Sequence, residues 1–479
     1  RIHELLAQLG KTPFFKHKKP TPYDEAVSLI WYLENVFYKS FGTVYDYIQQ
    51  NIFEGEHIQN DIINIGFWPG GDRDGNPFVT PEITLKVASR LRETIIKNYY
   101  RDLRRLKRKV SFVGVEDRIS VLEGEMYKMT TNKKTDLTLD HLVSELKEIK
   151  TEIIQKHQSL YASDVNSLLN KIHLFGFHFS SLDIRQDSRA HAKVFNDMVN
   201  VLIESGSSIF PTNYQSLSEA KQIVILSKIK GSLDMNLISD KETLKALKTM
   251  AVIRTIQETN GERGCHRYII SNCQTLENIL ELFAMYRISN WEKPSVDFIP
   301  LFETINDLRE ARAVMDGLFN NPVYMAHLKE RKYIQTVMLG FSDGTKDGGY
   351  FMANWSIYKA KETLSELAKE YGIRVAFFDG RGGPPARGGG NTHEFYSSLG
   401  DNIQSDDIQL TIQGQTISSN FGTTDSCQYN LEQLLSSGIS NTVLNTGKNN
   451  LMDADRKIME VIAEKSYEAY QKFKDHPQF

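Results

Sequence analysis

Charged side chains follow four apolar segments of the sequence, each at a point where a buried strand would end. Arg185 follows Ser-Leu-Asp-Ile, Glu303 follows Phe-Ile-Pro-Leu-Phe, Asp343 follows Val-Met-Leu-Gly-Phe-Ser, and Arg381 follows Val-Ala-Phe-Phe-Asp-Gly. In parallel α/β proteins, the loops at the carboxyl ends of the strands converge, and the N-termini of the helices face the ligand there. Four repeats of this arrangement predict a ligand-binding site at that edge of a sheet.

Glu303 and Asp343 are carboxylates at two different strand ends, and the sequence places no histidine or cysteine near either of them. Hard oxygen ligands of this kind suit Mg²⁺ or Mn²⁺ rather than zinc. Each carboxylate could instead cap the helix that follows it, a role that suits Asp343 well. The residue types therefore favour a magnesium or manganese site, with helix capping as the alternative.

Residues 380–390 contain six glycines and two arginines, Arg381 and Arg387. Glycine lets the backbone approach an anion closely, and the arginine fork matches a phosphate or a carboxylate. The segment is neither a Walker A loop nor a G-x-G-x-x-G fingerprint. It predicts a mobile loop that closes over an anion, and a plain flexible linker is the alternative.

Lys346 lies three residues after Asp343 and directly before a predicted helix. The helix macrodipole disfavours a positive charge at such a position, so a bound anion or a function would explain it. An exposed surface lysine is the alternative.

The elements that must position these residues change in character along the chain. From Tyr23 to about Asn170, apolar residues recur mostly at i, i+3, i+4 and i+7, which is typical of helices. One interruption, rich in glycine and proline, lies at residues 68–77 and contains Arg73 and Asp74. After residue 172, short β-branched and aromatic segments alternate with helical ones, which indicates a parallel sheet with crossover helices.

The predicted strands are residues 174–184, 266–271, 296–302, 334–341, 374–378 and 407–412, and the helices between them include 276–286, 307–318 and 351–371. Six such units favour a closed barrel or a doubly wound sheet. We therefore divide the chain into a helical part with the 70–77 loop (1–172), a part with the strands and catalytic loops (173–430) and a truncated helical segment (431–479).

The composition argues against several classes of protein. The formal net charge of −3 over 479 residues gives no electrostatic reason to expect nucleic acid as a partner. The sequence contains no segment of 18 or more apolar residues, so it predicts no membrane-spanning helix. Three cysteines without metal-ligand spacing indicate a reducing compartment, so we expect a cytoplasmic protein.

Both ends of the sequence lead us to expect a fragment of a longer protein. The first residue is arginine rather than methionine, and no signal-peptide pattern follows it. A helical apolar pattern over residues 467–479 stops without a cap.

At the residues described above, the chain resembles the phosphoenolpyruvate carboxylases. The resemblance runs from about Lys19 to the C-terminus. It is carried by GGDRDGNP (70–77), LDIRQDS (182–188), LFETINDL (301–308), VMLGFSDGTKDGG (337–349) and GRGGPPARGGG (380–390), in the order of the family. The last of these and QLTIQGQTISSNFGT (409–423) look most like a bacterial branch of that family.

The resemblance implies a fold and an activity. The fold would be α/β, a (β/α)8 barrel heavily elaborated with helices and mostly helical overall. The activity would be the formation of oxaloacetate and phosphate from phosphoenolpyruvate and bicarbonate, through carboxyphosphate and the enolate of pyruvate. The resemblance also implies that the parent protein is a homotetramer.

The resemblance assigns roles to single residues by position. Glu303 and Asp343 match the family's ligands for Mg²⁺ or Mn²⁺, and Lys346 matches its active-site lysine. Asp74 matches a residue of a loop that borders the same site.

The arginines match as well. Arg185 and Arg381 match arginines around the phosphate and the reacting centre, and Arg73 lies in the bordering loop as a substrate-binding candidate. Arg387 matches the arginine of the family's mobile glycine loop, which also contacts the feedback inhibitor aspartate.

The chain departs from the family at several positions. Asp379 stands where most relatives have a histidine, Phe341-Ser-Asp-Gly344 replaces Tyr-Ser-Asp-Ser, and Ile412-Gln-Gly-Gln415 replaces a segment that bears a glutamate. The family's T-A-H-P-T-E motif, with its catalytic histidine, and its C-terminal arginines are not in this sequence. We therefore expect these 479 residues to be inactive when made alone.

Two alternatives stay open. A different Mg²⁺-dependent barrel enzyme could act on phosphoenolpyruvate or pyruvate, but it would not combine GGDRDGNP with the glycine loop that has two arginines. A non-catalytic relative could act as a binding or regulatory subunit, and Asp379 is the feature that favours it.

Overall fold

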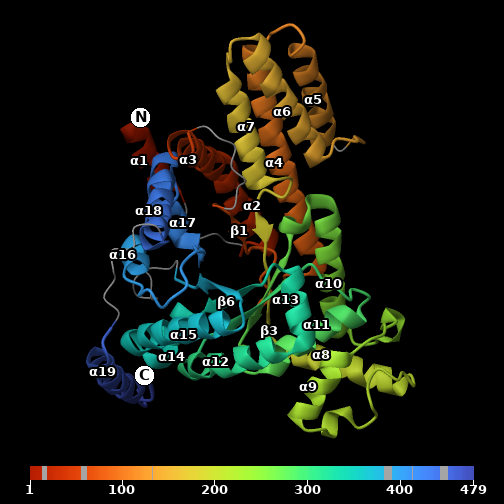
Figure 1. Ribbon diagram of the computed structural model, residues 1–479, viewed down its shortest axis with the longest axis vertical. Coiled ribbons are helices and arrows are strands. Elements are labelled where there is room, and N and C mark those ends of the chain that lie inside the picture. The colour runs from red at the N-terminus through yellow and green to blue at the C-terminus, as the bar shows by residue number, and fades with distance from the viewer. Residues whose placement is uncertain are drawn as a thin grey trace.

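The computed structural model describes residues 1–12, 19–54, 62–131, 133–381, 391–412, 414–442 and 451–478. Within these ranges the chain is mostly helical, and its strands pair in parallel (Figure 1). None of the described helices has the length and the apolar composition that crossing a membrane requires.

Helices form the N-terminal part of the molecule. The long helix α4 (Pro81–Lys109) begins with a proline, and the hydroxyl of Thr80 accepts a hydrogen bond from the Ile83 N–H at 3.3 Å. This cap satisfies one of the free N–H groups of the first turn. Figure 1 shows α5, α6 and α7 beside one half of α4 as a bundle at the top of the molecule. The other helices of the N-terminal part are α1 (Ile2–Lys11), α2 (Pro22–Tyr32), η1 (Leu33–Phe37), α3 (Tyr38–Asn51), α5 (Glu116–Thr130), α6 (Leu139–Lys156) and α7 (Ala162–Phe175).

The strands pair in the order in which they occur in the sequence. Six of them form one parallel sheet, and the short strand β1 lies beside β2, directly ahead of β3. An isolated bridge between Asp72 and Arg185 extends the pairing on that side. The strands are β1 (Gly66–Phe67), β2 (Ser181–Leu182), β3 (Ile184–Asp187), β4 (Arg267–Ser271), β5 (Asp297–Phe302), β6 (Ile334–Leu339), β7 (Arg374–Asp379) and β8 (Ile408–Leu410).

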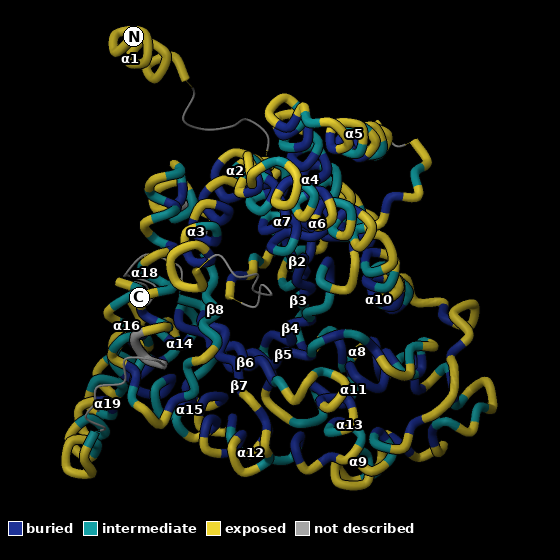
Figure 2. The backbone as a smooth tube through the Cα atoms, turned by 45° about the horizontal axis from the view of Figure 1, so that its top comes forward, coloured by how far each residue is buried: buried dark blue, intermediate teal, exposed yellow. Residues whose placement is uncertain are grey.

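Helices connect successive strands, as parallel pairing requires. Their outer faces are exposed and their inner faces join the strands in the main hydrophobic core, as the burial colours of Figure 2 show. They are α8 (Ser188–Glu204), α9 (Glu219–Lys228), α10 (Lys241–Asn260), α11 (Leu276–Ile288), α12 (Ile305–Asn320), α13 (Pro322–Glu330), α14 (Phe341–Gly348), α15 (Tyr350–Glu370) and α16 (Thr392–Ser397). The C-terminal helices α17 (Gly414–Asn420), α18 (Thr424–Thr442) and α19 (Asp453–Lys474) follow the last strand.

The sheet is curled, because side chains of distant strands meet on its inner face. The guanidinium of Arg267 on β4 donates a hydrogen bond to Gln409 on β8 at 2.9 Å. The ring of Trp68, just after β1, lies 6.0 Å from that of Phe378 on β7. A small inner cluster lies between the strands, with Trp68 packed against it, and consists of Ile269, Ile299, Leu301, Met338 and Phe378.

The predicted α/β class with parallel strands and mostly helical content is confirmed. The closed (β/α)8 barrel goes further than the described strands show, because no strand pairing among them joins β8 to β1. Figure 2 shows β2 to β8 set in an arc rather than a flat sheet.

The predicted strand at 174–184 is wrong in its first half. Helix α7 continues to Phe175, a turn follows with Gly176 at φ +49°, and extended structure begins only at Ser181. Phe177 and Phe179 alternate as in a strand, but both are buried among the helices. The structure therefore places Arg185 within β3 rather than beyond a strand end.

Candidate active site

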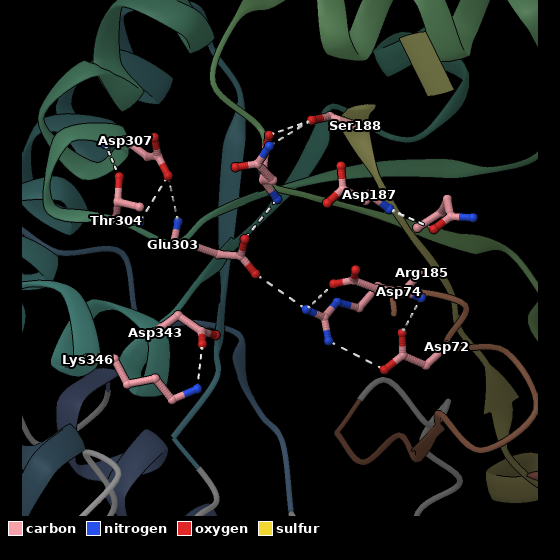
Figure 3. Close-up of polar contacts among 12 residues, drawn as sticks. Asp72, Asp74, Arg185, Asp187, Ser188, Glu303, Thr304, Asp307, Asp343 and Lys346 are labelled. Atoms are coloured by element: carbon pink, nitrogen blue, oxygen red, sulfur yellow. Dashed lines mark hydrogen bonds and ion pairs between the residues drawn. The ribbon is translucent and has the colours of Figure 1, made fainter. Parts of the chain in front are cut away.

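Several of the predicted site residues lie near the carboxyl ends of the strands β3, β5, β6 and β7. Figure 3 shows Glu303, Asp343 and Arg185 pointing toward one another from three elements. Residue 303 follows β5, residue 343 lies in the first turn of α14, and residue 185 lies on β3. These three predicted residues meet at this edge of the sheet, although Arg185 lies within β3 rather than beyond its end.

Glu303 faces the site and does not cap the helix that follows it. One carboxylate oxygen accepts a hydrogen bond from the Asn272 N–H at 2.9 Å, and the other lies 3.3 Å from Nη2 of Arg185. The start of α12 is capped instead by Thr304 and Asp307, whose side chains satisfy each other's backbone N–H groups. The Glu303 carboxylate therefore faces Arg185 and the Asn272 N–H rather than the start of α12.

The electrostatics of Glu303 reflect a crowded acidic site. Burial, with the nearby charges of Asp343 and Asp74, raises the pKa of Glu303 to about 6. The positive charge of Arg185 and the Asn272 N–H act in the opposite direction. A carboxylate in this position would gain from a cation beside it.

Two glycines let the strand ends come this close. A Cβ atom on Gly340, which precedes α14, would lie 3.1 Å from the Cα of Glu303. A Cβ atom on Gly380, which follows β7, would lie 3.1 Å from the carbonyl oxygen of Leu339. Contacts this short require a neighbour to shift, so both positions favour glycine.

Arg185 is held by three carboxylates. Its Nη2 atom lies 2.9 Å from Asp74 and 3.3 Å from Glu303, and its Nη1 atom lies 3.4 Å from Asp72. The ring of Trp68 lies 5.5 Å from the guanidinium carbon. The backbone of Arg185 also pairs with the 70–77 loop, since its N–H donates to Gly71 and its carbonyl accepts from Arg73.

Sequence reasoning missed Asp72 and Asn272. Asp72 is two residues from Asp74 and shares its arginine partner, so the Asp-x-Asp spacing is a signal that could have found it. Asn272 has φ +51°, which aims its N–H at Glu303, and no local pattern marks that contact.

The structure does not bring Arg73 to this site. Its side chain is 8 % exposed, and its Nη1 donates a hydrogen bond to Thr249 on α10. The side chain of Asp74, one residue later, points to Arg185 instead.

Asp343 and Lys346 lie together on α14. Lys346 Nζ is 3.0 Å from Asp343 Oδ1, and the two side chains are 68 % and 48 % exposed, respectively. The predicted helix does follow Lys346, as α15, but Lys346 itself lies in the last turn of α14, which runs from Phe341 to Gly348 and was not predicted. A positive charge is favourable there, so the macrodipole argument for a bound anion no longer applies.

Arg381 lies directly after β7 and Gly380. Its guanidinium carbon is 4.0 Å from the centroid of the Phe395 ring, and burial lowers its pKa. Arg387 and most of the 380–390 loop lie outside the described residues.

A cavity of about 1980 Å³ runs along this edge of the sheet and into its interior. The site residues that line it are Asp72, Asp74, Arg185, Asp343 and Arg381. Among the described residues, no group of three or more His, Cys, Asp or Glu side chains is arranged to hold a metal. Glu303 and Asp343 are nonetheless a hard-oxygen pair, and Mg²⁺ is commonly bound through one or two carboxylates with water and substrate oxygens completing its shell.

Comparisons with known proteins show which family the chain is similar to. The family model of phosphoenolpyruvate carboxylase matches residues 1–136 and 116–479. The phosphoenolpyruvate carboxylases of Trichormus variabilis and of Nostoc sp. (strain PCC 7120) are each 27 % identical to the chain, over 94 % of this chain and 52 % of their own length. That of Parasynechococcus marenigrum is 27 % identical over 98 % of this chain and 54 % of its own length. The chain spans about half the length of the curated relatives it matches.

Proposed function

Because the chain belongs to the phosphoenolpyruvate carboxylase family, we propose that its strand-end site forms oxaloacetate and phosphate from phosphoenolpyruvate and bicarbonate. The observation that carries the proposal is the meeting of Glu303, Asp343 and Arg185 at one edge of the sheet, with Arg381 on the same cavity. Two carboxylates for a cation and two arginines for an anion are the groups that a phosphorylated enol requires.

Glu303 and Asp343 would hold Mg²⁺ or Mn²⁺. The fit is supported by the negative charge that Asp343 adds to Glu303, and by the raised pKa of Glu303. When bound, the ion would act as a Lewis acid toward the enol oxygen of the substrate.

Arg185 and Arg381 would bind the phosphate and offset its charge. Bicarbonate oxygen attacks phosphorus, and the bond between phosphorus and the enol oxygen breaks, which gives carboxyphosphate and the enolate of pyruvate. Carboxyphosphate then divides into CO₂ and phosphate, and the enolate carbon attacks CO₂ to give oxaloacetate. Arginine forks are suited to hold the phosphoryl oxygens through the first step.

Lys346 and Arg387 complete the proposed set. Lys346 reaches the carboxylate of Asp343 at 3.0 Å and is more than half exposed, so its ammonium group can approach a bound anion from the solvent side. For Arg387, the support is its place in the glycine-rich loop two residues after two prolines. The loop would close over the bound anion.

We extend the proposal to the fold and the location. The curled sheet, with strands in sequence order around an inner cluster, is what part of a (β/α)8 barrel would look like. All three cysteines are free and buried, which supports a reducing, cytoplasmic environment.

The second candidate, a non-catalytic binding subunit, was favoured by Asp379. In the structure Asp379 is fully buried and paired with Lys361, which gives its presence an explanation other than a lost activity.

A coupled assay tests the proposed activity. The full-length protein is given phosphoenolpyruvate, bicarbonate and Mg²⁺, and oxaloacetate is followed with malate dehydrogenase and NADH. Oxaloacetate that depends on both bicarbonate and the metal is the expected result. Consumption of phosphoenolpyruvate without need of bicarbonate would point to a different barrel enzyme, and binding without turnover would point to a regulatory subunit.

We also propose that the 479-residue chain made alone does not turn over. The support is that it spans 52 % to 54 % of its relatives. Turnover by the chain alone at the rate of the full-length protein would overturn this part of the proposal.

A further inference from the structure

A fully buried ion pair includes Asp379, two residues before Arg381 in the sequence. Lys361 Nζ on α15 is 2.7 Å from Oδ2 of Asp379, the last residue of β7, and the two side chains are 2 % and 0 % exposed. The hydroxyl of Tyr396 on α16 donates a second hydrogen bond to the same oxygen at 2.8 Å. The three side chains therefore join a helix, a strand end and the short helix that follows the glycine-rich loop.

A buried ion pair of this kind often adds little net stability to a fold. Removing two charges from water costs several kcal/mol for each ion, and apolar residues of similar size often stabilise a core as well or better. Burial lowers the pKa of Lys361, and the charge of Asp379 opposes that shift. A role other than bulk stability would explain why the pair is present.

The pair connects to Arg381 through Phe395. The Phe395 ring lies 4.0 Å from the guanidinium carbon of Arg381 and 5.4 Å from Lys361 Nζ. Its ring neighbours are Tyr396, at 5.0 Å, and Phe341, at 5.7 Å. The hydrogen bond from Tyr396 to Asp379 thus fixes the helix that supplies the ring under Arg381.

The backbone of Asp379 fixes the other side of Arg381. Its carbonyl accepts a hydrogen bond from the Thr411 N–H at 3.1 Å, and the next residue, Gly380, donates to Leu339 at 3.0 Å. The strand end and α16 are therefore both tied to residue 379, two residues before the arginine.

We propose that Lys361, Asp379 and Tyr396 are positioning residues that hold Arg381 over the Phe395 ring, with Lys361 as the buried counter-charge that an aspartate at position 379 requires. An aspartate there adds a negative charge to the core, and Lys361 neutralises it. The inference rests on the proposed function, because it assumes that Arg381 acts on the substrate.

Two neutral double variants separate positioning from mere stability. Lys361→Met with Asp379→Asn keeps an acceptor for Tyr396, whereas Lys361→Met with Asp379→Leu removes it, and asparagine and leucine have similar shapes. Lys361→Met alone leaves a buried carboxylate without its cation and should lose much stability. Lys369→Met, an exposed lysine near the end of the same helix, is the control.

Three measurements are made on the full-length protein: the melting temperature, kcat for oxaloacetate, and the rate at which phenylglyoxal labels Arg381, read by mass spectrometry. Both double variants should melt above the Lys361→Met single variant. The leucine double variant should have kcat at least about tenfold below the asparagine one, because small displacements of a catalytic group cost this much or more. It should also label severalfold faster at Arg381.

Equal labelling and equal kcat in the two double variants would overturn the inference and leave the pair a structural feature. If the wild-type protein forms no oxaloacetate, the proposed function fails, while the labelling of Arg381 still decides whether these residues position it.

Discussion

The Nη2 atom of Arg185 lies 3.3 Å from Glu303 and 2.9 Å from Asp74, so one nitrogen links a proposed metal ligand to the 70–77 loop. A phosphate that binds Arg185 must therefore compete with carboxylates that already hold it. Because Asp74 of the 70–77 loop and Glu303 share this arginine, the position of the loop should depend on the charge of Glu303.

Arg185→Lys keeps the charge but loses the fork that reaches three carboxylates. We expect kcat/KM for phosphoenolpyruvate to fall at least about 100-fold, the usual effect of losing a preorganised donor. Steady-state kinetics of the full-length protein measure it. Arg105→Lys, on the exposed face of α4, is the control and should leave kcat/KM unchanged. A loss under threefold in Arg185→Lys would remove this residue from the site.

Gly71→Ala should disrupt the loop. A Cβ atom there would lie 2.0 Å from the carbonyl oxygen of Asp183, so the pairing between Gly71 and Arg185 must open. We expect a loss of about 1–3 kcal/mol in the free energy of unfolding, typical of overpacking, together with lower activity. Urea unfolding measures the first. Gly124→Ala, in α5 with no atom within 4 Å, should be neutral or stabilising. Equal stabilities of the two variants would contradict the close packing at residue 71.

Local patterns predicted most of the strands and that Glu303 and Arg381 follow strand ends, but they did not predict that Arg185 lies within β3, nor the contacts between elements. The apolar segment before Glu303 is buried on β5, and glycine and serine after the next strand mark the start of α14. The alternation of Phe175, Phe177 and Phe179 predicted a strand because aromatic spacing does not tell a helix end from a sheet.

The pairing partners could not be read from the sequence for a physical reason. Lys361 and Asp379 are 18 residues apart on a helix and a strand, and only the packing of α15 on β7 brings them together. Arg73 and Asp74 are neighbours in sequence, yet their side chains go to α10 and to Arg185, respectively. The direction of a side chain in a loop depends on the contacts that it makes with other parts of the fold.

The stability of the protein should depend on pH through Glu281, which lies on α11 and outside the strand-end site. Burial and the charge of Glu277 raise its pKa to about 7. The folded state then holds a proton that the unfolded chain releases near pH 4.5. The free energy of unfolding therefore falls as the pH rises from about 4.5 to about 7, by up to about 3 kcal/mol.

Replacing the carboxyl group removes that cost. Glu281→Gln should melt above the wild type at pH 8, and the difference should shrink to nothing as the pH falls to about 4.5. Differential scanning calorimetry across this range measures it. A gap between the two proteins that does not change with pH would show that Glu281 is ionised in the folded state throughout.

The metal proposal makes the most direct prediction. Glu303 directly follows β5, and Asp343 lies in the helix that follows the neighbouring strand β6. Each has a cationic side chain as partner, Arg185 or Lys346, respectively. If the two carboxylates share one metal ion, removing the charge of either should weaken the binding of that ion. We expect Asp343→Asn and Glu303→Gln each to raise the Kd for Mn²⁺ at least about tenfold, since even outer-shell changes at metal sites cost about 10–100-fold.

Binding can be measured without turnover, by electron paramagnetic resonance of free Mn²⁺ in titrations of the full-length protein. Glu310→Gln, an exposed carboxylate on α12, is the matched control and should bind as the wild type does. Melting temperatures separate lost ligation from lost folding, because Glu303 does not cap α12 and Thr304 with Asp307 does. If both site variants keep the wild-type Kd and fold normally, these two carboxylates do not hold the metal, and they serve only as partners of Arg185 and Lys346, respectively.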